Sequence, residues 1–192
     1  MSDLMALFGL VASAPEAAVS GFWLHPSLLL LVGAVVLPLL PARLRPAWMV
    51  LVPVLTFARI VALAKGSFGA VSFLQFTLEF GRVDALSLVF AYIMGLMCIL
   101  GTLYGLHVKR AVETSAAWIY VAGSIGAIFA GDLLTLFLFW EVMALSSVFL
   151  IWFRGRAESL SAGYRYLLVH MAGGVALLAG IMLHYRATGS MA

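Results

Sequence analysis

The chain has 192 residues, of which 65% are hydrophobic and only 10% are charged, and its mean hydropathy is +1.14. This composition excludes an ordinary water-soluble domain. The eleven lysines and arginines are scattered between apolar runs, which excludes a nucleic-acid-binding face. The single cysteine, Cys98, excludes an internal disulfide framework and any cysteine-based zinc or iron–sulfur site.

Long apolar segments predict an all-α fold, a polytopic membrane protein with about six transmembrane helices, because one crossing takes roughly 20 apolar residues. The expected spans cover about residues 24–40, 46–64, 84–106, 115–130, 133–153 and 161–185. The first 20 residues contain no lysine or arginine, so they are expected to form a lead-in and not a signal peptide. Between the second and third spans, residues 65–83 partly alternate between large apolar and smaller residues, which predicts an extended or hairpin segment at the surface.

Basic residues gather in alternate loops, and such loops usually face the cytoplasm. The pairs concerned are Arg43 and Arg45, Lys109 and Arg110, and Arg154 and Arg156. We therefore expect a multi-pass protein of the cell (inner) membrane with both termini on the outer side. Lys65 and Arg82, in the longest outer loop, are a mild exception.

Glu141 stands near the middle of the fifth expected span, and its neighbours are aromatic or aliphatic. A charged side chain at the centre of a membrane helix costs roughly 2.5 to 3.5 kcal/mol, so such residues usually face the protein interior and serve ion or proton pathways. Burial favours the neutral carboxyl, and a carboxyl poised between its two forms can accept and release a proton. We predict that Glu141 is a proton carrier; the alternative is a structural carboxyl bound to a neighbouring helix.

Two further candidates lie on the sixth expected span. His170, about ten residues into the span, fits either a proton relay or a histidine hydrogen-bonded within the bundle. Arg165, one turn nearer the cytoplasmic end, fits either an electrostatic partner of a carboxylate or a side chain that extends to the membrane interface.

The remaining polar residues have simpler explanations. Asp84 and Asp132, at expected helix starts, are more typical of helix caps than of ion ligands, and three others lie near the membrane interfaces: Arg59, His107 and His184. Small residues on the fourth and sixth spans predict close helix packing; they are Gly123, Ser124, Gly126, Ala172, Ala176 and Gly180. No phosphate loop, nucleophile elbow, paired zinc ligands or dinucleotide motif is present in the sequence. No cofactor or metal is therefore expected.

Residues 131–153, GDLLTLFLFWEVMALSSVFLIWF, closely resemble the fifth transmembrane helix of the antiporter-like subunits of respiratory complex I, membrane-bound hydrogenases and Mrp-type Na+/H+ antiporters. Residues 165–181, RYLLVHMAGGVALLAGI, resemble the sixth helix, nearest to the branches of the Mrp D subunit and of the hydrogenase-associated subunits. Residues 83–89, VDALSLV, resemble the start of the third helix. The resemblance implies that Glu141 belongs to the proton relay. It also implies an outward N-terminus and partner membrane subunits from an Mrp-like, complex I-like or hydrogenase complex.

A full subunit of that family contains further helices, including a seventh with an essential lysine, so the resemblance implies an N-terminal portion only. Residues 1–80 are expected to hold the lead-in, two helices and an outer loop. Residues 81–192 would hold four helices that begin the proton-translocating region and then stop. Arg165 stands where several relatives have a lysine, and it titrates far less readily.

The sequence thus predicts a membrane subunit of a complex that translocates protons or exchanges a cation such as Na+ for H+. Any electron transfer, of the NADH:quinone oxidoreductase or hydrogenase type, would take place in partner subunits, and whether the assembly is an enzyme is left open. The rival interpretation is a non-conducting structural subunit, or a degenerate fragment, that scaffolds the complex.

Overall fold

The computed structural model describes residues 23–73 and 76–191, so the predicted N-terminal lead-in lies outside the described residues. Within these ranges the chain forms long helices and one β-hairpin. The elements are α2 (Pro26–Leu39), α3 (Arg45–Val61), β1 (Gly66–Phe73), β2 (Phe76–Val83), α4 (Ala85–Tyr104), the 3-10 turn η1 (Gly105–His107), α5 (Ala111–Ile128), α6 (Leu133–Trp152) and α7 (Ala157–Thr188).

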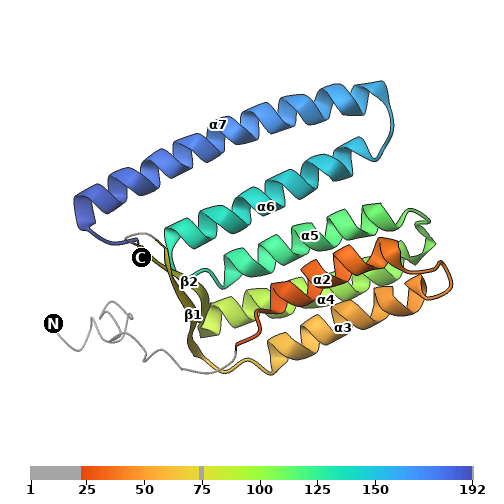
Figure 1. Cartoon of the computed structure of the whole chain (residues 1–192), viewed down its shortest axis with the longest axis horizontal. Coiled ribbons are helices and arrows are strands. Elements are labelled where there is room, and N and C mark those ends of the chain that lie inside the picture. The colour runs from red at the N-terminus through yellow and green to blue at the C-terminus, as the bar shows by residue number, and fades with distance from the viewer. Residues whose placement is uncertain (1–22, 74–75, 192) are drawn as a thin grey trace.

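The helices lie side by side and run alternately up and down, with the hairpin at one end of the bundle (Figure 1). Helix α5 packs against α2 on one side and α6 on the other, while α7 packs on α6 at the outer edge. The fully buried side chains come mainly from α2 and α5; they include Leu30, Leu37, Trp118 and Ile125. The best-packed part of the molecule therefore lies between the first helices and α5, and α7 is the most exposed helix.

The predicted membrane architecture is confirmed, and the count of about six spans is approximate. Among the described residues, four helices are long and apolar enough to cross a membrane: Ala85–His107, Ala111–Ile128, Leu133–Trp152 and Ala157–Thr188. Helix α2 has only 14 residues; at about 1.5 Å per residue it falls short of a hydrocarbon core roughly 30 Å thick. Helix α3, with 17 residues, is intermediate in length between α2 and the four long helices.

The predicted boundaries hold to within four residues. Helix α5 begins at Ala111 and α7 extends over Ala157–Thr188, so both helices contain charged residues that the sequence pattern assigned to loops. An acidic residue in the first helical turn, Glu113 in α5 and Glu158 in α7, interacts favourably with the helix dipole. This explains why these helices start before their apolar stretches.

Strands β1 and β2 pair antiparallel as the expected hairpin, and β2 is fixed to the turn between α5 and α6. The Arg82 N–H donates to the Phe129 carbonyl at 2.7 Å, and the Gly131 N–H donates to the Glu79 carbonyl at 2.9 Å. The Glu79 N–H donates to Oδ2 of Asp132 at 2.7 Å. These three bonds attach the hairpin to the start of the helix that carries Glu141.

The basic loops gather at the opposite end of the bundle, where α2 connects to α3, α4 to α5, and α6 to α7 (Figure 1). Nη1 of Arg110, in the α4–α5 loop, donates to the Phe153 carbonyl at the end of α6 over 3.2 Å. The six basic residues that were expected on one side of the membrane therefore lie at one end of the molecule.

Candidate functional site: a glutamate–histidine pair between two helices

Helix α6, which carries Glu141, starts at a well-satisfied cap. Oδ1 of Asp132 accepts from the Thr135 N–H at 2.8 Å, and Oδ2 accepts from the Thr135 hydroxyl at 2.5 Å in addition to the hairpin N–H. Asp132 is 9% exposed and Thr135 is fully buried. Asp132 thus acts as a cap, as the sequence indicated, because its oxygens are occupied by donors of the protein.

Asp84 caps α4 in the same way. Its Oδ1 accepts from the Ser87 N–H at 2.6 Å, while the Asp84 N–H donates to the Ser87 hydroxyl at 2.8 Å, which completes a capping box. The hydrogen bond from the Ser87 N–H is the main reason that the pKa of the Asp84 carboxyl, just outside the helix, lies below its usual range.

The structure brings together two of the three predicted site residues. Oε1 of Glu141 on α6 lies 3.8 Å from Nε2 of His170 on α7, and the two side chains are 31% and 15% exposed respectively. This distance is too long for a direct hydrogen bond. Nε2 of His170 is buried and has no hydrogen-bond partner within the described part of the chain. An acid and a base therefore face each other across the α6–α7 contact.

Gly174 makes room for the carboxyl group. A Cβ atom placed on Gly174 would stand 2.5 Å from Oε1 of Glu141 and 3.5 Å from its Cδ. The carboxyl group therefore packs directly on the bare backbone of α7. Because Gly174 lies one turn beyond His170, the same stretch of α7 presents both the imidazole and the space in front of it.

Aromatic rings hold the imidazole from two sides. The Trp140 ring meets the His170 ring edge-on with centroids 5.9 Å apart, and the Tyr166 ring stacks on it at the same centroid distance with an interplanar angle of 20°. The hydroxyl oxygens of Tyr166 and Ser147 lie 2.9 Å apart. Sequence reasoning missed Trp140 and Tyr166. Their positions, one residue before Glu141 and one turn before His170, could have indicated them.

Arg165 lies elsewhere. It is exposed, and no ion pair joins it to Glu141 in the described residues. Nine residues at about 100° each place it roughly half a turn away from Gly174, on the opposite face of α7. Its predicted role as an electrostatic partner of the carboxylate is therefore not supported by a contact and stays a prediction.

The small residues of the fourth span fulfil the packing expectation. A Cβ on Gly123 would stand 2.7 Å from Cγ of Met143, and one on Gly126 would overlap the Phe139 ring, so α5 approaches α6 closely. On α7, by contrast, Ala172, Ala176 and Gly180 are exposed. The glycines of α7 that contact α6 are Gly163 and Gly174.

No group of three histidine, cysteine, aspartate or glutamate side chains suited to a metal ion occurs in residues 23–73 and 76–191. The pair at the α6–α7 contact consists of one carboxyl and one imidazole, two groups that can each accept and release a proton. The same two helices lie in the part of the chain that a known protein family matches.

The family model described as NADH:quinone oxidoreductase/Mrp antiporter, TM, matches residues 130–192, which contain α6, α7 and the complete Glu141–His170 pair. The A subunit of a Na+/H+ antiporter from Alkalihalophilus pseudofirmus is 32% identical over 117 residues, which cover 56% of this chain and 14% of that protein. The A1 subunit of a Na+/H+ antiporter from Staphylococcus aureus is 27% identical over 179 residues, which cover 83% of this chain and 22% of that protein. The resemblance to the antiporter-like membrane subunits is confirmed.

Two solved structures share the fold of this chain. A chain of the membrane-bound sulfane sulfur reductase, an archaeal respiratory membrane complex, superposes with a TM-score of 0.72 at 19% identity, covering 85% of this chain and 37% of that one. A chain of respiratory complex I from Thermus thermophilus gives 0.68 at 22% identity, with coverages of 86% and 38%. These likenesses show that the chain shares its fold with membrane-complex chains of both assemblies.

The chain spans about 14% and 22% of the lengths of the two antiporter-like relatives. Both relatives are of the A type, whereas the sequence motifs suggested the branches of the Mrp D subunit and of the hydrogenase-associated subunits. The branch within the antiporter-like family therefore stays a prediction.

Proposed function

We propose that the chain is a subunit of an ion-translocating membrane complex in which Glu141 carries protons and His170 exchanges them with it. The observation that carries the proposal is the pair itself, a carboxyl oxygen and an imidazole nitrogen 3.8 Å apart on two apolar helices long enough to cross a membrane. Ionisable residues at such depth are costly, which favours a functional interpretation.

In the proposed step the neutral Glu141 carboxyl gives its proton to Nε2 of neutral His170. One O–H bond breaks and one N–H bond forms, so the products are a carboxylate and an imidazolium. Direct transfer takes heavy atoms about 2.6–3.2 Å apart, or one bridging water. Closing the gap from 3.8 Å requires only a small side-chain movement, and Nε2 has no competing donor or acceptor in the described residues.

The partners we propose are other membrane subunits of an Mrp-like, complex I-like or hydrogenase complex, embedded in the lipid bilayer. The ions are H+ and, by analogy with the Na+/H+ antiporter relatives, Na+. The basic loops would face the cytoplasm, with both termini on the outer side of the inner membrane. We also propose the division of the chain into residues 1–80, with the lead-in, two helices and an outer loop, and residues 81–192, with the four helices that begin the proton-translocating region.

Ion transport in vesicles that contain the assembled complex tests the role of Glu141. Glu141→Gln keeps the shape of the side chain but cannot ionise, so we expect transport to fall about a hundredfold or more, the usual range for losing a positioned acid–base group. Glu141→Ala should do the same. Retention of all subunits after purification shows that assembly survives each substitution.

His170→Gln provides the second arm of this test. It should lower transport less than Glu141→Gln and change its pH profile, because an imidazole can accept and release a proton while the glutamine amide cannot. Unchanged transport in assembled Glu141→Gln complexes would instead identify the chain as a non-conducting scaffold.

A further inference from the structure

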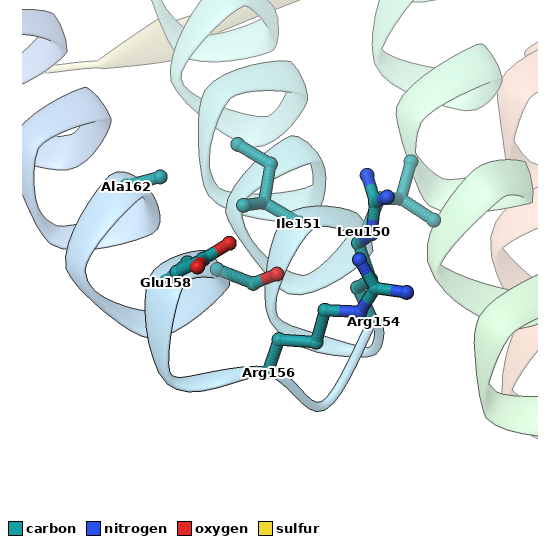
Figure 2. A pocket seen from close by; sticks show the side chains of 7 residues that line it. Leu150, Ile151, Arg154, Arg156, Glu158 and Ala162 are labelled. Carbon is teal, nitrogen blue, oxygen red and sulfur yellow. The ribbon is translucent and has the colours of Figure 1, made fainter.

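A pocket opens at the basic end of the bundle, where the α6–α7 loop leads into α7 (Figure 2). Its volume is about 500 Å³, within the range of small-ligand sites, and polar and apolar side chains both line it. The lining residues are Leu150, Ile151, Arg154, Arg156, Glu158, Ser159 and Ala162. This pocket is separate from the Glu141–His170 pair and takes no part in the function proposed above.

The charges in the pocket are arranged asymmetrically. Arg154 and Arg156 extend along one side, and Glu158, in the first turn of α7, lies on the other (Figure 2). None of these three side chains forms an ion pair within the described part of the chain. The pocket therefore offers two unpaired cations opposite one unpaired carboxylate.

The first turn of α7 adds hydrogen-bond donors to the side of the cations. The cap residue Arg156 provides no side-chain hydrogen bond to the turn, which leaves N–H groups available to an anion. Ser159 lines the pocket and is only 8% exposed, yet its hydroxyl makes no hydrogen bond to any described residue. The hydroxyl oxygen itself stays accessible from the pocket, so it can donate a hydrogen bond to a polar group bound there.

The apolar lining identifies the kind of ligand. Leu150 and Ile151 from α6 and Ala162 from α7 form the apolar part of the pocket wall. A free phosphate ion would gain nothing from this wall. A ligand with a charged head and an apolar tail would fill both parts.

We propose that this pocket binds the headgroup of a phospholipid that carries a primary ammonium group. The phosphate contacts Arg154, Arg156 and the Ser159 hydroxyl, because guanidinium groups match phosphate oxygens in charge and geometry. The ammonium group contacts Glu158, whose charge would repel a purely anionic headgroup. The acyl chains run along the apolar wall between α6 and α7.

Native mass spectrometry of the purified full chain, offered equal amounts of phosphatidylethanolamine, phosphatidylglycerol and phosphatidylcholine with identical acyl chains, tests the proposal. The wild-type chain should retain phosphatidylethanolamine preferentially. Arg154→Gln/Arg156→Gln should lower that retention about tenfold or more, since two charge-assisted contacts are lost. Glu158→Gln should abolish the preference over phosphatidylglycerol while phosphate binding persists.

Arg43→Gln/Lys109→Gln is the matched control, because it removes two exposed cations at the same end of the bundle but outside the pocket. It should leave lipid retention unchanged. Arg154→Lys/Arg156→Lys keeps both charges and serves as a control for misfolding of the glutamine variant. It should lose part of the phosphatidylethanolamine retention, since lysine lacks the bidentate fork of arginine.

Three results would each overturn the proposal. The glutamine double variant could retain the ethanolamine lipid as well as the wild type does, or the wild type could hold all three lipids equally. In a competition arm, inorganic phosphate could displace the bound lipid, which would assign the pocket to a free anion.

Discussion

Replacing Gly174 by alanine should separate proton transport from the stability of the chain. The new Cβ would stand 2.5 Å from Oε1 of Glu141, the same oxygen that faces His170. Ordinary carbon–oxygen contact begins near 3.4 Å, so the carboxyl group must retreat by about 1 Å. A glutamate side chain has rotatable bonds, and it can move without disturbing the helices.

The consequence for transport follows from geometry. A displacement of about 1 Å at a reacting group can cost on the order of a hundredfold in rate, and the gap of 3.8 Å to His170 already exceeds the distance for direct transfer. We therefore expect Gly174→Ala to lower transport by one to two orders of magnitude, roughly tenfold to a hundredfold.

The expected effect on stability is small. Gly174 lies inside α7 and is not among the glycines with positive φ, so alanine fits the backbone there. Alanine in a helix interior is favoured over glycine by roughly 0.5–1 kcal/mol. Part of this gain offsets the cost of moving Glu141, and the thermal midpoint should stay near that of the wild type.

Gly173 offers the matched control one residue away, because a Cβ on it meets nothing within 4 Å. Gly173→Ala should keep transport and gain roughly 0.5–1 kcal/mol of stability, because no side chain has to move. The measurements are pH-dye quenching in vesicles with the assembled complex and thermal unfolding followed by circular dichroism. If Gly174→Ala transports as fast as Gly173→Ala, the carboxyl position seen here is not the working one and the reasoning fails.

Substitutions at three further positions test the helix caps and the surroundings of the pair. Asp132→Ala removes the acceptor of three hydrogen bonds at the start of α6. It should lower the free energy of unfolding by about 2 kcal/mol, which is measured as a lower denaturation midpoint. Asp132→Asn should recover part of this loss. Tyr166→Phe keeps the ring stacked on the imidazole but loses the hydroxyl contact with Ser147, so transport should persist. Tyr166→Ala removes the ring and should reduce transport. Equal transport by the two variants would argue against a positioning role for the ring. The cap at Asp84 has a lowered pKa, so its contribution to stability is present above the usual carboxyl pKa and is lost as the pH falls through the lower, folded-state value. In Asp84→Asn, the thermal midpoint should accordingly vary less between about pH 5 and pH 2.

The sequence contained enough to predict the helices and the acidic candidate. Apolar runs long enough to cross a bilayer leave little choice of secondary structure, because every backbone polar group must be bonded internally. Glu141 was conspicuous for the same reason, as a carboxyl within an apolar helix. The caps at Asp84 and Asp132 were also predictable, since capping depends on residues only three positions apart.

The partners of Glu141 were not predictable from the residue pattern alone. Whether His170 or Arg165 faces α6 depends on the rotation of α7 about its axis, and both residues lie in the same apolar stretch. That rotation follows from packing at Gly163 and Gly174, where α7 meets side chains of α6. The small residues Ala172, Ala176 and Gly180 suggested a different contact face, because spacing identifies a close-packing surface without identifying the neighbour.

The hydrogen bonds between the hairpin and the α5–α6 turn fix the distance of Glu141 from the hairpin end of the bundle. Glu141 is nine residues beyond Asp132, so at about 1.5 Å per residue its Cα stands roughly 14 Å along the helix from that anchor. This is close to half of a hydrocarbon core about 30 Å thick. In a bilayer whose boundary lies at Asp132, the carboxyl group would be almost equally distant from the two aqueous phases. Depth alone gives a proton no preferred direction, so directionality has to come from the order in which each side gains access.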